Sequence, residues 1–339
     1  MQTCNRYIPL LLAMLLCACQ EELTPRTTVD SLRILSIAAD PPEVYPGASS
    51  RINALIADPL GEGRTLDWFL TLCTPDAERG GCLELNELLE EYPDPDYANT
   101  EYARCCVRGG SAAPSNGVLN LGAPGLTRLT TAATMLEGVT EETALNGTNA
   151  QLNLIVCVSG VCTSSDTSEG DSPQDSGISL PSEQSTLALK RLRVSTRPGS
   201  EVNRNPTLLG LYVNGQPFET GEELILQGGT SYQLTPWPSS TTLECYENLD
   251  GDGNATFLSE TPYFSWYATA GDFDEYFTEP MLITDCEDPT PMDERFDEAV
   301  NTWSIPPLES LSASRQTLYL VMWDRRGGLT WLVVPIQII

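Results

Sequence analysis

Strand-length apolar segments separated by turn residues run through most of this 339-residue chain and limit the folds open to it. They lie at 32–38, 51–57, 66–72, 151–158, 187–194, 207–213, 223–227, 231–235, 263–268, 302–305, 317–323 and 329–338. Asn214-Gly215 after one segment signals a two-residue β-hairpin, and residues 324–328 join the last two segments as a tight turn. Because helical periodicity is scarce, we expect an all-β protein.

Composition divides the chain into two domains. A run rich in Ser, Asp, Gly and Pro at 164–185 is too polar to bury and predicts a surface loop, and a second polar break at 198–206 predicts a linker. We therefore expect one domain at 31–197 and another at 207–339. Within the first, an insertion at 83–105 carries leucines spaced i, i+3, i+4 at Leu85, Leu88 and Leu89, which predicts a short acidic helix.

The beginning of the sequence predicts export. Residues 8–16 are apolar and follow Arg6, but they are too few to cross a bilayer, which takes roughly 20 residues. The tetrapeptide Leu16-Cys17-Ala18-Cys19 resembles the lipobox of bacterial lipoprotein precursors. This resemblance implies a signal peptide at 1–18, lipid on Cys19, a polar tether at 19–30 and anchoring to a membrane. Gln20, where some lipoproteins have Asp, implies sorting to the outer membrane.

The cysteine count favours the same oxidising compartment. Of the 11 cysteines, Cys4 and Cys17 fall in the signal segment and Cys19 takes lipid, which leaves 8 for disulfides. Cys245 and Cys286 are the two in the second domain, so we expect them to pair. The other six leave 15 connectivities open: Cys73, Cys82, Cys105, Cys106, Cys157 and Cys162. A zinc site is disfavoured because the chain has neither CxxC pairs nor histidine.

Charge and composition exclude several functions. With 47 acidic and 18 basic residues the net charge is −29, which opposes binding to the phosphates of nucleic acid. The chain contains no histidine, so Ser-His-Asp and Cys-His catalysis and histidine-based metal hydrolysis are excluded. A carboxylate-pair glycosidase remains conceivable, but nothing in the sequence singles out two of the many acids. We therefore expect a protein that is not an enzyme.

Two tryptophans sit at equivalent places in the two domains. Trp68 in Asp-Trp-Phe-Leu and Trp266 in Ser-Trp-Tyr-Ala each lie in a third main strand, where immunoglobulin-type sandwiches bury one. Residues 264–266, the segment 320–330 with its Asp-Arg-Arg-Gly-Gly turn, and Ile-Ala-Asp-Pro at 56–59 resemble bacterial immunoglobulin-like, PKD-like and cadherin-like modules. The resemblance implies two immunoglobulin-like β-sandwich domains in tandem, and with the lipobox it implies a bacterial envelope lipoprotein.

An acidic loop in the second domain is a candidate calcium site. Asn248, Asp250, Asp252 and Asn254 alternate around Gly253 in the manner of the first half of an EF-hand loop. The twelfth position is Ser259, with Glu260 one residue late, so the usual bidentate ligand is missing. Calcium binding and an ordinary Asp-Gly turn therefore stay as two alternatives.

Large aromatic residues are the second hint of a ligand. The second domain contains six that could stack on sugar rings or fill the core: Trp237, Tyr246, Tyr267, Trp303, Trp323 and Trp331. We expect a non-enzymatic, membrane-anchored structural or interaction module that contacts protein or polysaccharide of the envelope and needs no cofactor. The alternative is a calcium-assisted adhesin or polysaccharide-binding protein, which a concave or flat patch of exposed aromatics near the acidic loops would favour.

Replacing Cys19, the expected lipid attachment residue, tests the predicted location at a membrane. Cys19→Ala should move the protein from the membrane fraction to the soluble fraction, because the acyl chains supply about 0.8 kcal/mol of membrane affinity per buried CH₂. Fractionation followed by immunoblotting measures this. A Cys19→Ala protein that stays with the membrane, or an unmodified peptide spanning residue 19 in mass spectrometry of the processed wild type, would contradict the lipoprotein interpretation.

Overall fold

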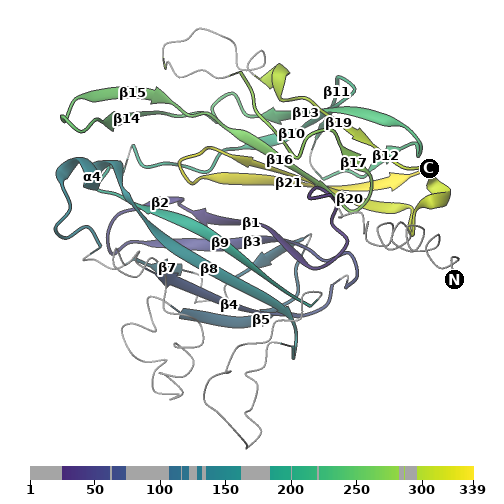
Figure 1. The fold of residues 1–339 in the computed structure, drawn as a ribbon, viewed down its shortest axis with the longest axis horizontal. Helices are drawn as coiled ribbons and strands as arrows, with labels where there is room; N and C mark the ends of the chain where they lie inside the picture. Colours follow the sequence, from purple (N-terminus) through teal and green to yellow (C-terminus); the bar gives the residue numbers. More distant parts are fainter. Residues whose placement is uncertain are drawn as a thin grey trace, which may run out of the picture.

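The structure is a computed structural model that describes residues 25–61, 63–73, 107–115, 117–121, 128–131, 135–161, 184–199, 201–219, 221–281, 286 and 296–339. This part of the chain is built of strands, and its one α-helix is the six-residue α4 (Glu141–Asn146) (Figure 1). The expectation of an all-β protein is thus confirmed. The predicted helix near residue 85 lies outside the described residues.

Strands from the first part of the chain form two sheets. Sheet I has the order β2 (Glu43–Val44), β9 (Ser185–Val194), β8 (Thr148–Val158), β4 (Leu66–Cys73), β5 (Val107–Ala112). Sheet II has the order β1 (Arg33–Asp40), β3 (Ser49–Ala57), β6 (Val118–Asn120), and β7 (Arg128–Thr130) also pairs with β3. A buried core with Trp68 lies between the two sheets.

The second part of the chain forms two more sheets and a hairpin. Sheet III has the order β12 (Leu224–Leu226), β21 (Leu329–Ile338), β20 (Arg315–Trp323), β16 (Tyr263–Ala268), β18 (Phe277–Thr278). Sheet IV has the order β11 (Gln216–Glu219), β10 (Leu208–Val213), β13 (Ser231–Pro238), β19 (Asn301–Ser304), β17 (Asp272–Phe273). The hairpin is β14 (Cys245–Leu249) with β15 (Ala255–Ser259), and the 3₁₀ turns are η2 (Asp297–Ala299) and η3 (Leu308–Ser310). Trp266 is fully buried in the core between sheets III and IV.

A third apolar cluster joins the two pairs of sheets. Leu55 from β3 of sheet II packs in it with Val321 from β20 and Leu329 from β21 of sheet III. The sheets are therefore stacked in the order I, II, III, IV, and sheets II and III are the inner layers (Figure 1).

The alternation of side chains along the inner strands explains this stack. In β20, Leu320 points into the core shared with sheet IV, while its neighbours Tyr319 and Val321 point toward sheet II. Successive residues of a strand face opposite sides of a sheet. A strand buried on both sides must therefore be apolar nearly throughout, which is why the sequence of β20 shows almost no polar alternation.

Local chemistry specified the turns correctly. Asn214 and Gly215 have positive φ angles of 49° and 76° and connect β10 to β11, so the predicted hairpin is confirmed. The turn between β20 and β21 is confirmed as well. Helix α4 was not expected; Thr140 caps it by accepting a hydrogen bond from the Thr143 N–H at 3.1 Å, and Gly147 ends it.

Two polar stretches of the sequence are held against the body. Val29 is buried, and its N–H donates to the Ala268 carbonyl of β16 at 2.8 Å. Asn203, within the stretch expected to be a linker, is also fully buried. The segments before β1 and before β10 are thus packed against the layers at these points.

Truncating a side chain of the cluster between sheets II and III tests the stack. Leu55→Ala should lower the free energy of unfolding by about 2–5 kcal/mol, because Leu55 is fully buried and its loss leaves a cavity. Leu189→Ala is the matched control, since Leu189 of β9 is 64% exposed and its truncation should change stability by less than about 0.5 kcal/mol. Urea denaturation of the full chain measures both, and equal effects would contradict burial between these layers.

Candidate functional site

The turn between β20 and β21 folds around the carboxylate of Asp324. Its Oδ1 accepts hydrogen bonds from the backbone N–H groups of Arg326, Gly327 and Gly328 at 2.7, 2.9 and 2.8 Å. Gly328 has to be glycine, because a Cβ there would lie 2.0 Å from Oδ2 of Asp324. The turn that the sequence predicted is therefore held by hydrogen bonds from its own backbone N–H groups to the buried carboxylate of Asp324.

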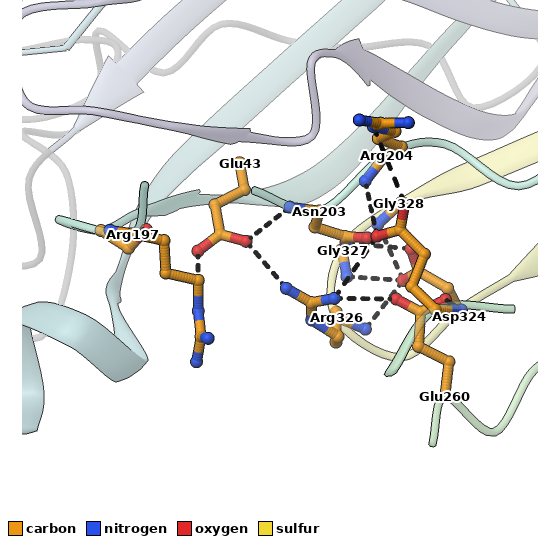
Figure 2. Close-up of polar contacts among 11 residues, drawn as sticks. Glu43, Arg197, Asn203, Arg204, Glu260, Asp324, Arg326, Gly327 and Gly328 are labelled. Atoms are coloured by element: carbon orange, nitrogen blue, oxygen red, sulfur yellow. Dashed lines mark hydrogen bonds and ion pairs between the residues drawn. The ribbon is translucent and has the colours of Figure 1, made fainter. Parts of the chain in front are cut away.

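Arg326 extends this turn into a buried ionic cluster. Its guanidinium is 3.1 Å from Oε1 of Glu260 and 3.1 Å from Oε2 of Glu43 (Figure 2). It also lies 4.2 Å from the ring centroid of Tyr246. Glu43 comes from β2 of sheet I, whereas Glu260 precedes β16 of sheet III. One buried side chain thus connects the two pairs of sheets.

Further groups bind the segment between the two sheet pairs to this cluster. The backbone N–H of Asn203 donates to Oε2 of Glu43 at 2.9 Å, and its side-chain amide donates to Oδ2 of Asp324 at 2.9 Å. Arg197 forms a longer ion pair with Glu43 at 3.6 Å (Figure 2). Lys190 of β9 donates to the Gly327 carbonyl.

Burial shifts the titration of the cluster. The pKa of Glu260 is raised to about 8, because burial and the nearby charge of Asp324 disfavour its ionised form. Burial also raises the pKa of Asp324, against the hydrogen bonds from Asn203 and the Arg326 N–H. Burial lowers the pKa of Lys190 to about 8, and the charge of Asp324 opposes this shift.

The cluster is closed to large molecules. Glu43, Glu260 and Asp324 are 0%, 3% and 1% exposed, so their carboxylates are not presented to a substrate. Charges buried in this way add little to stability but require one arrangement of their partners, because an unpaired charge would cost several kcal/mol. The cluster therefore fixes how sheets I and III lie relative to each other.

A cavity of about 670 Å³ lies elsewhere, over β10 and β13 of sheet IV and beside η2. Its walls combine aromatic, apolar and a few polar side chains: Leu209, Tyr212, Thr235, Pro236, Trp237, Pro238, Ser240, Phe296 and Asp297, together with Gly215. Its volume is in the range of pockets that hold small organic ligands.

Register explains why aromatic rings face this cavity. Tyr212 pairs with Thr235 and Gly210 pairs with Trp237, so these four residues share the face of sheet IV that points away from the core. The rings of Tyr212 and Trp237 are diagonal neighbours with centroids 5.3 Å apart at an interplanar angle of 38°. Gly210 has no side chain to cover Trp237. The pair forms a half-buried aromatic surface.

The structure separates the six candidate aromatics. Trp303 is fully buried in the core, and Tyr267, Trp323 and Trp331 pack against the cluster between sheets II and III. Tyr246 lies beneath Arg326. Trp237 is the member of the set that lines the cavity, and Tyr212, which the sequence did not single out, lies beside it.

The acidic loop between β14 and β15 closes on itself. Oδ1 of Asp250 accepts hydrogen bonds from the backbone N–H groups of Asp252 and Asn254 at 3.0 and 2.8 Å, and the Asn254 amide also donates to Asp250. These hydrogen bonds lower the pKa of Asp250. Within the described ranges no three acidic or cysteine side chains converge as metal ligands, and calcium binding at Asn248, Asp250, Asp252 and Asn254 stays a prediction.

The structure contains the disulfide between Cys245 and Cys286 that the sequence indicated. Cys157 is disulfide-bonded as well, and it is buried in β8. Cys73 ends β4. The remaining predicted cysteines, which are Cys19, Cys82, Cys105, Cys106 and Cys162, lie outside the described residues. Across the described residues, no helix combines the length and the apolar character needed to span a bilayer.

The ionic cluster was not predicted from the sequence, and of the pair of neighbouring aromatic rings in the cavity Trp237 was named but Tyr212 was not. Glu43 and Arg326 are 283 residues apart, and nothing in either local sequence connects them. The only available signal was the unusual Asp-Arg-Arg-Gly-Gly turn, which places two arginines beside an acid. The cavity depends on which strands become neighbours, and alternation alone does not give that.

Comparisons with known proteins find distant likenesses only. No described protein family and no curated protein matches the chain. A nucleoside hydrolase-related hypothetical protein from Saccharophagus degradans, associated with carbohydrate metabolism, is 12% identical with a TM-score of 0.25, over 44% of this chain and 35% of that one. Dimeric latent PorU from Porphyromonas gingivalis is 11% identical with a TM-score of 0.23, over 91% and 24%.

SGBP-B of the Bacteroides ovatus mixed-linkage glucan utilization locus, solved with a mixed-linkage heptasaccharide, is 11% identical with a TM-score of 0.17. The match covers 92% of this chain and 48% of that one. This chain therefore spans less than half the length of each of the three structures. Likenesses of this size carry no conclusion about fold or ligand.

The ionic cluster predicts how stability depends on pH. Between pH 4.5 and 8 the unfolded chain has released the proton of Glu260 while the folded chain retains it, so the free energy of unfolding should fall as pH rises, by up to about 1.4 kcal/mol per pH unit. Lys190 acts in the opposite direction above pH 8, because its folded pKa lies below the ordinary 10.5. Urea denaturation from pH 5 to 10 measures both slopes.

Glu260→Gln should reduce the downward slope between pH 5 and 8, since the amide cannot titrate and only Asp324, whose pKa burial also raises, still contributes from this cluster. Glu279→Gln is the control, because Glu279 forms an exposed ion pair with Arg325 outside the cluster. A Glu260→Gln protein with the slope of the wild type would show that burial of Glu260 does not control this dependence.

Proposed function

We propose that this protein is a lipid-anchored, non-enzymatic protein of the bacterial cell envelope that binds carbohydrate in the cavity at Trp237. The observation that carries the proposal is the pair of half-buried rings, Tyr212 and Trp237, beside a carboxylate and two hydroxyls in one cavity. Trp237 is one of the six aromatics that the sequence offered as sugar-stacking residues.

The chemistry of the cavity suits a sugar ring. A pyranose has an apolar face of C–H groups that packs on an aromatic ring, and a rim of hydroxyls that need hydrogen-bond partners. Trp237 supplies the ring, while Thr235, Ser240 and Asp297 supply polar groups at the edges of the cavity. A mainly apolar pocket with a few polar groups is the usual form of a small-ligand site.

The layers behind sheet IV keep these groups in place. Leu211 and Leu234, the neighbours of Tyr212 and Thr235 along β10 and β13, are fully buried in the core shared with sheet III. The strands that hold the rings therefore cannot shift without opening that core. A rigid support of this kind lowers the entropic cost of binding.

The envelope location and the domain type are part of the same proposal. The lipobox at Cys19 supports the anchor and outer-membrane sorting, and the Cys245–Cys286 disulfide agrees with an oxidising compartment. We propose that each pair of sheets is an immunoglobulin-like sandwich, which the tryptophans Trp68 and Trp266 buried between their sheets support.

A tryptophan truncation tests the carbohydrate site. A panel of soluble, uncharged polysaccharides, screened by affinity electrophoresis and then titrated calorimetrically as oligosaccharides, should yield at least one that binds. Trp237→Ala should weaken that binding by roughly thirtyfold or more, as expected for a central aromatic contact worth at least 2 kcal/mol.

Phe257→Ala is the matched control, because Phe257 on β15 is 66% exposed and does not line the cavity. It should leave affinity unchanged. If no polysaccharide binds, or if Trp237→Ala binds as tightly as Phe257→Ala, the protein does not use this cavity for carbohydrate.

A further inference from the structure

The charges around the cavity restrict the carbohydrate that it can hold, an inference that rests on the proposed function. Asp297 is the acidic residue that lines the cavity, and it is exposed. None of the described lining residues is lysine or arginine. A uronate or sulfate group bound here would lie near the negative charge of Asp297, and the described lining offers it no lysine or arginine.

Strand register adds a second carboxylate on the same face. Gly210 of β10 pairs with Trp237 on one side and with Glu219 of β11 on the other, so Glu219 points outward in the same row as Trp237. Two strand spacings separate Glu219 from Trp237, which is about 10 Å. Glu219 is therefore an acid on the same face as the aromatic pair, in addition to Asp297 in the lining of the cavity.

Two arginines of the second half of the chain form ion pairs away from the lining residues. Arg315, at the start of β20, forms an ion pair with Glu223, and Arg204 forms one with Glu244. Neither lines the cavity. The described lining of the cavity thus contains one acid and no basic residue, in a chain whose net charge is −29.

We infer that the cavity is selective for uncharged glycans and that Asp297 is the residue that enforces the selection. A neutral sugar presents hydroxyl donors, and the Asp297 carboxylate can accept hydrogen bonds from them. An acidic sugar presents a carboxylate or sulfate in place of a hydroxyl, so the same contact becomes a repulsion. Selection therefore depends on the Asp297 carboxylate, which is a favourable partner for a sugar hydroxyl and an unfavourable one for a sugar carboxylate or sulfate.

A matched pair of probes measures this selectivity. The neutral oligosaccharide that binds best is compared with the same oligosaccharide after oxidation of its primary hydroxyls to carboxylates. At 0.15 M salt the Debye length is about 8 Å, so charges far from the cavity are largely screened. The wild type should bind the neutral probe at least tenfold more tightly than the oxidised one.

Asp297→Asn should reduce this ratio severalfold, because an amide neither repels a carboxylate nor loses the ability to hydrogen-bond. Asp272→Asn is the matched control: Asp272 is an exposed acid on β17 at the opposite edge of sheet IV, and its replacement changes net charge equally. The Asp272→Asn ratio should equal that of the wild type.

The other possible results separate failure of the selectivity from failure of the proposed function. Equal binding of both probes by the wild type would overturn the selectivity, and an equal change of ratio in Asp297→Asn and Asp272→Asn would assign it to net charge rather than to Asp297. In both cases the proposed function still holds if Trp237→Ala weakens binding of the neutral probe. Neutral binding that survives Trp237→Ala would instead overturn the proposed function itself.

Discussion

Strands β1, β3, β20 and β21 have apolar side chains on both faces, and each face must be removed from water. Sheets II and III therefore each need two partners, and they meet each other through Leu55, Val321 and Leu329. Sheets I and IV cover the remaining faces. At roughly 25 cal/mol per Å² of apolar surface, burial on this scale is the largest favourable term in folding. The order of the layers follows from it.

The ionic cluster and the cavity use this stack in different ways. Arg326 lies where β2, the segment around Asn203 and the β20–β21 turn converge, and its contacts admit one relative placement of sheets I and III. The cavity lies beside β10 and β13 of sheet IV, and its lining combines the half-buried Tyr212 and Trp237 with Phe296, which packs in the core. The proposed carbohydrate site thus belongs to an outer sheet, where changes at the surface leave the inner layers intact.

Strands and tight turns could be predicted because their signals are local. Asn214-Gly215 needs positive φ angles that few other pairs adopt, and the segments 263–268 and 329–338 match β16 and β21 at both ends. Helix α4 was missed because six residues are too few to show a period. The approach of Glu43 to Arg326 and of Tyr212 to Trp237 depends on which strands become neighbours, which no short segment encodes.

The buried position of Asn203 has a consequence for how this chain can be divided. A fragment made by cutting at 198–206 would expose Leu55 on one piece and Val321 on the other to water. It would also separate Glu43 on the first piece from Arg326 on the second. Asp324 on the second piece would lose the nearby charge of Lys190, which is on the first. The two halves are therefore not interchangeable modules. A rearranged version of the chain would have to keep both the apolar contact between sheets II and III and the contacts of the ionic cluster.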